Sequence, residues 1–249
     1  MDPHSANPHP DQLPPLTWSY AMRQRAQEVI PGVFVGPYTM ARNIPTLIAL
    51  GISHCVLVQS TFEARLRTPQ LAQHGIQVLH MTVEESQTQN VISLFPQFSQ
   101  FVNQALAIRQ AALDDQGPID DPEVLAMAQG WNVHAPLARQ GNVLVMCLDG
   151  MSRGPTFVIA YIMAKYALNL STTMQYVQTR RYCVFPSDGF RYQLMEYEPI
   201  LMAQQASIQG STAPEKKRVV DSVADSGNAS TGFSDRPTRR RREDSDDES

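Results

Sequence analysis

Short apolar runs alternate along the chain with stretches in which apolar residues recur every three or four positions. The apolar runs predict strands over residues 32–36, 54–58, 77–81 and 142–145. The stretches with helical spacing predict helices over residues 41–50, 94–108 and 156–167. Because strands separated by helices pair in parallel through crossover connections, we expect an α/β fold with a mainly parallel central sheet flanked by helices.

The two ends of the chain and one internal segment interrupt this alternation. Residues 1–16 contain five prolines, and we expect this lead-in to be disordered, like the charged tail 204–249. Residues 17–203 then form a single domain. Within it, residues 114–140 carry two Asp-Asp pairs and three prolines. We expect a surface insertion there, because so few apolar residues cannot bury a core of their own.

Composition and charge exclude several classes of function. The chain of 249 residues is 43% hydrophobic, which is enough for a packed core, and no apolar run approaches the roughly 18–20 residues of a membrane span. Before residue 215 the chain holds 12 basic and 15 acidic residues, which does not favour nucleic-acid binding. Three cysteines, an odd number, argue against a disulfide framework and indicate a reducing, intracellular compartment.

The segment from Cys147 to Arg153 carries the sharpest chemical signal. A cysteine ends an apolar strand, five residues form a tight loop, and an arginine opens an apolar helix. The amides of such a loop bind an oxyanion, and we expect their field to lower the pKa of Cys147 and favour its thiolate. Arg153 offers a planar fork for two phosphate oxygens, and Gly150 permits a close backbone approach. The plainer alternative is a buried cysteine beside a surface arginine.

This loop resembles the Cys-x5-Arg phosphate-binding loop of the cysteine-based protein tyrosine phosphatases. Three further segments, Gln27–Tyr38, Phe157–Met163 and Tyr176–Arg181, are similar to the dual-specificity phosphatases, and most of all to their pseudophosphatase group, the serine/threonine/tyrosine-interacting proteins. The resemblance covers about residues 17–203 without the insertion. It implies a dual-specificity-phosphatase-like domain with a shallow pocket that admits phosphotyrosine, phosphoserine and phosphothreonine.

The resemblance also implies roles for single residues. Cys147 would be the nucleophile, Arg153 the phosphate clamp and Ser152 the residue that helps the thiolate leave. The family's general acid is an aspartate on a loop, and its position matches Glu85, which could protonate the leaving oxygen and later activate water. The residues alone favour the plainer interpretation of Glu85 as a solvated loop residue, and only the resemblance gives it the role of the acid. The remaining phosphate oxygens would be bound by the loop amides of Leu148, Asp149, Gly150, Met151, Ser152 and Arg153.

Three departures from the family pattern leave two functions open. Met146 stands where the family has a histidine that helps to lower the thiol pKa, Glu85 replaces an aspartate, and Ser187 replaces an asparagine. The pseudophosphatase group has glycine at the cysteine position, whereas this chain keeps Cys147. We therefore expect a protein phosphatase that works through a phosphocysteine intermediate; the alternative is a phospho-residue-binding adaptor that shields phosphorylated partners or competes for them.

The expected partners follow from this chemistry. They are phosphorylated proteins, with no nucleic acid and no membrane, and the chain is expected to act as a monomer. Cysteine chemistry needs no cofactor, and the six histidines share no ligand spacing, so no metal site is expected. We expect the protein in the cytoplasm. The run Arg239–Arg242 is either a nuclear import signal or a solvated part of the tail.

Overall fold

A five-stranded sheet forms the centre of the protein, described by a computed structural model over residues 18–65, 68–86, 89–133 and 136–211. The strand order is β1-β2-β5-β3-β4. Every neighbouring pair is parallel except β1 and β2, which are antiparallel. This confirms the mainly parallel sheet. The strands are β1 (Gln27–Ile30), β2 (Val33–Pro37), β3 (Ile52–Gln59), β4 (Gln77–Thr82) and β5 (Asn142–Cys147).

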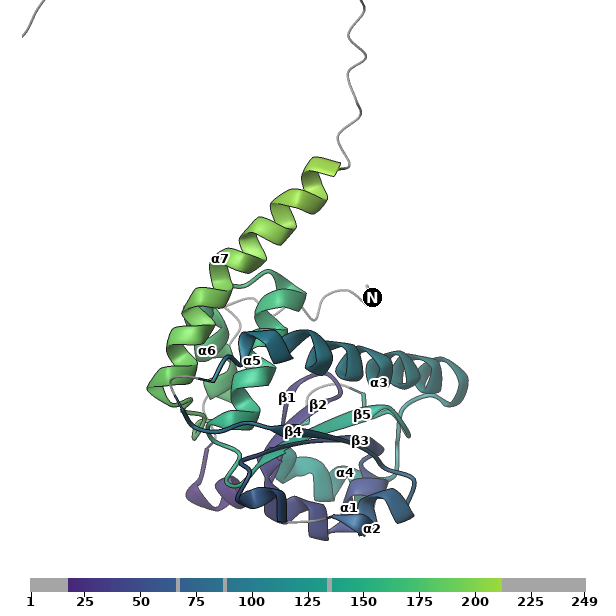
Figure 1. The fold of residues 1–249 in the computed structure, drawn as a ribbon. Helices are drawn as coiled ribbons and strands as arrows, with labels where there is room; N and C mark the ends of the chain where they lie inside the picture. The colour runs from purple at the N-terminus through teal and green to yellow at the C-terminus, as the bar shows by residue number, and fades with distance from the viewer. Residues whose placement is uncertain (1–17, 66–67, 87–88, 134–135, 212–249) are drawn as a thin grey trace, which may run out of the picture. The chain divides into compact units, whose positions relative to one another are not determined.

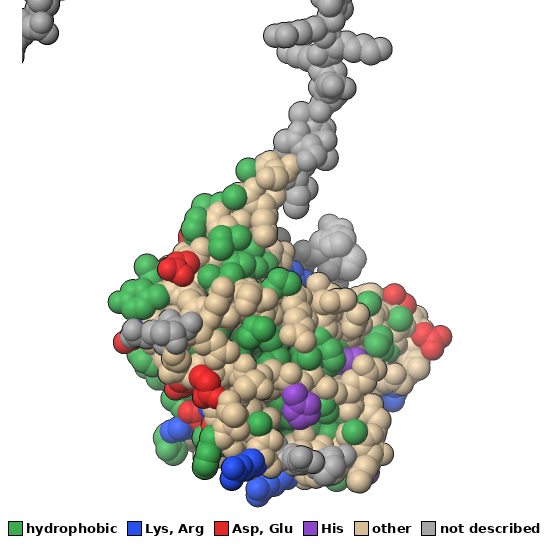
Figure 2. Space-filling model, in the orientation of Figure 1, with side chains coloured by type: hydrophobic (Ala, Val, Ile, Leu, Met, Phe, Trp, Pro, Cys, Tyr) green, Lys and Arg blue, Asp and Glu red, His purple; other side chains and the backbone are tan. Residues whose placement is uncertain are grey.

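Helices cover both faces of the sheet (Figure 1). Helices α3, α5, α6 and α7 lie on one face, and the shorter helices α1, α2 and α4 lie on the other. Exposed apolar side chains gather along α7 (Figure 2). The helices are α1 (Ile44–Ala49), α2 (Pro69–Gln73), α3 (Phe95–Gln116), α4 (Pro122–Ala128), α5 (Arg153–Tyr166), α6 (Leu170–Arg180) and α7 (Asp188–Ser211).

Each face of the sheet has its own hydrophobic core. On the side of the long helices, valines of the strands pack against Phe95 and Phe98 of α3 and Phe157 of α5. On the other side, Phe34 and Leu144 pack with Trp131 and the apolar face of α1. Because β5 lies between these two cores, all six of its residues are buried, which explains why its sequence is apolar from Val143 to Cys147.

The predicted strands and helices are confirmed, with differences at their ends. The predicted helix over 41–50 begins at Ile44, because Asn43 caps it by accepting a hydrogen bond from the amide of Thr46, and a 3-10 turn, η3 (Tyr38–Arg42), precedes it. Helix α3 continues to Gln116, and Gly117 with a positive φ ends it. Strand β1 was not predicted.

The segment 114–140 is not purely a surface insertion, and this corrects our expectation. It forms the end of α3, helix α4 and a 3-10 turn. Its side chains Ile119, Trp131 and Leu137 are buried in the second core. The segment therefore does not need a core of its own, because it completes one that the sheet and α1 begin.

The expected boundary at residue 203 is also too early, since α7 continues to Ser211. The lead-in 1–16 and most of the tail, including Arg239–Arg242, lie outside the described residues. Among the helices that are described, none combines the length and the apolar character of a membrane span.

Candidate active site

The loop 148–152 connects the central strand β5 to helix α5. Cys147 is the last residue of β5, and Arg153 is the first residue of α5. Strand β5 lies between the parallel strands β2 and β3. The loop therefore stands at the carboxyl edge of the parallel strands, where open α/β sheets bind their ligands.

Each carbonyl group of this loop accepts a hydrogen bond from outside the loop. Because the N–H and C=O of a planar peptide point in opposite directions, the amides of residues 149–153 turn toward the inside, where they can bind an oxyanion. The donors are Tyr38 N to Leu148 O (3.4 Å), Arg181 to Asp149 O (3.2 Å) and Gly150 O (2.9 Å), Phe185 N to Met151 O (2.8 Å), and Thr156 N to Ser152 O (3.0 Å).

Gly150 is required at its position in the loop. Its φ is +68°, a conformation that favours glycine. A Cβ atom there would lie 2.5 Å from the carbonyl carbon of Gly36 in β2. The loop can therefore pack closely against β2 only with glycine at this point.

Arg181 supports the loop from behind, and sequence reasoning gave it no role. Its side chain is fully buried and makes hydrogen bonds with five acceptors. Two of these are loop carbonyls, and the others belong to the N-terminal segment and β1. Since a buried guanidinium needs acceptors on all sides, Arg181 fixes the loop to the start of the domain. The N-terminal acceptors are Arg23 O, Arg25 O and Gln27 Oε1.

The thiol of Cys147 differs from the expectation of a lowered pKa. Burial raises the pKa of Cys147 above its ordinary value, and this outweighs the amide hydrogen bonds from Gly154 and Gly150 and the charge of Arg153. The Asp149 carboxylate raises the pKa of Cys147 further. The amides and Arg153 do lower the pKa as expected, but burial of the thiol and the approach of the Asp149 carboxylate, which the sequence did not reveal, outweigh them.

Asp149 turns its carboxylate into the loop. Its Oδ1 atom lies 3.8 Å from the Cys147 sulfur and accepts a hydrogen bond of 2.9 Å from the amide of Met151. One of the inward amides is therefore already paired. A phosphate group entering the loop has to compete with this carboxylate.

Arg153 is held by Glu63, which sequence reasoning missed. Its Nη1 and Nη2 atoms donate hydrogen bonds of 2.5 and 2.7 Å to the two carboxylate oxygens of Glu63. The Arg153 hydrogen bonds are the largest cause of the lowered pKa of Glu63. Glu63 belongs to a short 3-10 turn after β3, in a stretch without motif or periodicity, so nothing in the sequence singled it out.

Glu85 lies near the same arginine. Its Oε1 atom is 3.9 Å from Arg153 Nε, and its side chain is 48% exposed. The carboxylate of the neighbouring Glu84 accepts a hydrogen bond from the amide of Thr61. Of these two acidic residues, Glu85 is the one whose carboxylate is paired with the predicted phosphate clamp.

Ser152 connects the loop to the segment before α7. Its hydroxyl oxygen accepts a hydrogen bond of 3.1 Å from the amide of Ser187. This contact orients the side chain and leaves its hydroxyl hydrogen able to donate. Leu148 is 53% exposed at the rim of the loop. Within the described ranges, no group of three or more His, Cys, Asp or Glu side chains is arranged to hold a metal ion.

Comparisons with known proteins identify relatives of this chain. The family model described as "Dual specificity phosphatase, catalytic domain" matches residues 131–200. The serine/threonine/tyrosine-interacting protein of Mus musculus is 32% identical over 189 residues, which cover 75% of this chain and 70% of that protein. The dual specificity protein phosphatase 1B of Arabidopsis thaliana is 42% identical over 71 residues, 28% of this chain and 38% of that protein.

Solved structures give the same result for the fold. The crystal structure of the human tyrosine phosphatase-like serine/threonine/tyrosine-interacting protein has a TM-score of 0.54 and 30% sequence identity. The similarity covers 72% of this chain and 99% of that one.

Proposed function

The chain belongs to the dual-specificity phosphatase family, and from this premise we propose that it is a cysteine-dependent protein phosphatase of low turnover. Its substrates would be phosphotyrosine and phosphoserine or phosphothreonine in proteins. The observation that carries the proposal is the convergence of three groups. Cys147 and Arg153 flank one loop, and Glu85, from a separate loop, lies 3.9 Å from Arg153.

The reaction proceeds in two steps. In the first, the Cys147 thiolate attacks phosphorus, so that an S–P bond forms while the P–O bond to the substrate side chain breaks. Glu85 gives its proton to the leaving oxygen. In the second, water attacks the phosphocysteine, the Glu85 carboxylate takes a proton from it, and the S–P bond breaks to release inorganic phosphate. Arg153 and the loop amides stabilise the charge that develops on the phosphoryl oxygens.

Low turnover follows from the electrostatics of the site. Burial and Asp149 raise the pKa of the nucleophile, so a small fraction of Cys147 is thiolate at neutral pH. Glu63 accepts two hydrogen bonds from Arg153, so the guanidinium is already paired when a phosphate group arrives. Met146 is fully buried beside the nucleophile in β5 and has no imidazole to donate to the loop.

The second candidate function is a phospho-residue-binding adaptor. It is supported by the same raised pKa, and by relatives that are named as interacting proteins. In this case the amides and Arg153 would bind a phosphorylated side chain that Cys147 does not attack. The two functions differ in what Cys147 contributes.

Phosphate release from an aryl phosphate, measured against pH, tests the proposal. The parent chain should release phosphate with a bell-shaped dependence on pH, because the reaction needs both the Cys147 thiolate and a protonated Glu85, while Cys147→Ser releases none. Glu85→Gln should lower the rate by about a hundredfold or more, the usual contribution of a general acid. A parent rate equal to that of Cys147→Ser would overturn the phosphatase proposal.

Binding of a phosphotyrosine peptide tests the adaptor. If the chain is an adaptor, Arg153→Ala should lose binding, and Cys147→Ala should bind as the parent does. Binding that survives Arg153→Ala would exclude both functions, because each needs the guanidinium at the phosphate.

A further inference from the structure

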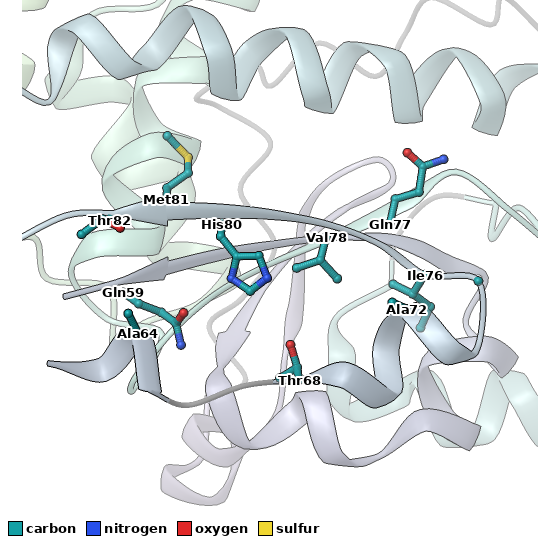
Figure 3. Close-up of a pocket in the computed structure, with 11 residues that line it drawn as sticks. Gln59, Ala64, Thr68, Ala72, Ile76, Gln77, Val78, His80, Met81 and Thr82 are labelled. Carbon is teal, nitrogen blue, oxygen red and sulfur yellow. The ribbon is translucent and has the colours of Figure 1, made fainter. Parts of the chain in front are cut away.

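A groove lies under the outer edge of the sheet, apart from the Cys147 loop. It has a volume of about 810 Å³ and runs between strand β4 and the segment that carries α2 (Figure 3). Apolar side chains form much of its lining, among them Ile76 and Val78. At one end it reaches Gln59 and Ala64, and Ala64 is adjacent in sequence to Glu63, which holds Arg153.

Strand β4 is an edge strand of the sheet and lies above this groove. In the part of the chain that is described, β4 pairs with β3 on one side and has no strand on the other. Residues 77–82 include no charged residue and no proline, the usual features that prevent an edge strand from pairing with another chain. In the middle of the strand, Val78 and Leu79 are partly exposed.

Thr68 adds a polar group to the groove. Its side chain is 6% exposed, and among the residues that the structure describes its hydroxyl oxygen has no hydrogen-bond partner. The hydroxyl points into the groove, toward Val78 and His80 (Figure 3). It does not cap α2. Because buried hydroxyl groups are nearly always paired, this one indicates a ligand with a hydrogen-bond acceptor.

We propose that the groove and the β4 edge bind an extended segment of a partner protein. The segment adds a sixth strand to the sheet, and its main chain pairs with outer-edge amides and carbonyls of β4 that precede Thr82, whose carbonyl already accepts a hydrogen bond from Gln89 Nε2. One apolar side chain of the segment enters the groove, and a neighbouring acceptor pairs with Thr68. A strand edge favours a peptide over a small molecule, since a main chain presents donors and acceptors at the spacing of the amides and carbonyls along that edge.

The position of the groove supports a protein as the occupant. A segment that follows β4 toward Gln59 and Ala64 reaches the residues beside Glu63. One partner could therefore contact both this edge and the Cys147 loop. The proposal does not depend on whether Cys147 turns over phosphate, because the peptide needs no phosphate group.

Selection from a phage-displayed library of random, unphosphorylated peptides tests the proposal. The full chain is the target, with phosphate in the buffer to occupy the Cys147 loop. Enriched peptides are then measured by fluorescence anisotropy against Ala72→Arg, whose arginine fills the groove, and Gln73→Arg, a neighbour on α2 that does not line it. Binding should fall about tenfold or more with Ala72→Arg and stay within about twofold with Gln73→Arg.

Two further measurements test whether the peptide binds at β4 and at Thr68. Bound peptide should slow amide hydrogen exchange in residues 77–82. Thr68→Val should weaken the peptide about threefold to tenfold, as expected for one lost hydrogen bond, while the melting temperature stays equal or rises. A peptide that binds both arginine variants equally, or a library that yields no binder, would overturn the proposal. A dimer of the parent that Ala72→Arg dissociates would identify a second copy as the occupant and overturn it too.

Discussion

The carboxylate of Glu63 lies against the guanidinium of Arg153 in a fork-to-fork pair, with hydrogen bonds of 2.5 and 2.7 Å. The two side chains are 13% and 9% exposed, so little water screens the pair. A phosphate group presents the same two-oxygen geometry to an arginine as a carboxylate does. Any phosphate that binds beside Cys147 must therefore share Arg153 with Glu63 or displace it.

Replacing Glu63 with Gln should strengthen oxyanion binding. The variant removes one negative charge next to Arg153, while the amide oxygen can still accept one hydrogen bond from the guanidinium. We expect the dissociation constant for tungstate to fall about tenfold at low ionic strength, and less at high salt. Isothermal titration calorimetry measures it. Glu196→Gln, an exposed change of the same kind on α7, should have no effect. Weaker tungstate binding by Glu63→Gln would mean that Glu63 positions Arg153 instead of competing for it.

Because of the same ion pair, the free energy of unfolding should depend on pH in the acidic range. The Arg153 hydrogen bonds hold the pKa of Glu63 below its ordinary value, so its stabilising contribution is complete above the pKa of the unfolded chain. It is lost as pH falls through the lower pKa of the folded state. The parent should therefore lose stability more steeply than Glu63→Gln below about pH 5.

Urea unfolding at a series of pH values measures this difference. At neutral pH, Glu63→Gln should be less stable by about 1–3 kcal/mol, because a largely buried charged hydrogen bond is lost. The two stability curves should approach each other in acid. Parallel curves would contradict a lowered pKa of Glu63.

The sequence predicted the sheet well where burial depends on apolar side chains alone. Strand β5 is apolar from Val143 to Cys147 and lies between two cores. Strand β1 was missed because Gln27 and Glu28 are polar but buried. Gln27 accepts a hydrogen bond from Arg181, and Glu28 accepts one from the amide of Gly32. Their burial depends on particular partners, which a pattern of hydrophobic positions does not contain.

The candidate site was predictable to the extent that it is continuous in sequence. Cys147 and Arg153 belong to one loop between a strand and a helix, so their spacing was informative. Glu63 meets Arg153 across 90 positions, and in sequence it is one acidic residue among many. The prediction of a lowered pKa for Cys147 was wrong. Burial of the thiol and the direction of the Asp149 side chain raise this pKa, and both are tertiary properties.

Replacing Asp149 with Asn should lower the pKa of Cys147. The change removes a negative charge 3.8 Å from the sulfur, and the asparagine oxygen can still accept the amide of Met151, so the loop keeps its shape. The rate of alkylation by iodoacetamide, measured against pH, reports the thiolate directly. Its rising limb should move to lower pH in Asp149→Asn, and phosphate release should rise at neutral pH. An unchanged alkylation profile would show that Asp149 has no influence on the thiol.

The adjacent residues Arg180 and Arg181 offer a matched test of what holds the loop. Arg181 is fully buried and donates hydrogen bonds to two loop carbonyls, whereas two buried nitrogens of Arg180 have no hydrogen-bond partner within the described part of the chain. Arg181→Met should lower the free energy of unfolding by about 3–5 kcal/mol, because it leaves several buried carbonyls unpaired. Arg180→Met should change stability by less than about 1 kcal/mol.

Unfolding in guanidinium chloride measures both variants, and tungstate binding measures the loop itself. Arg181→Lys keeps the charge but cannot reach all the acceptors, so it should fold with an intermediate loss of stability and weakened tungstate binding. Arg180→Lys should match the parent in both measurements. If Arg181→Lys bound tungstate as the parent does, the loop would hold its shape without the guanidinium. In that case, the close packing of Gly150 against β2 would be sufficient to form the anion site.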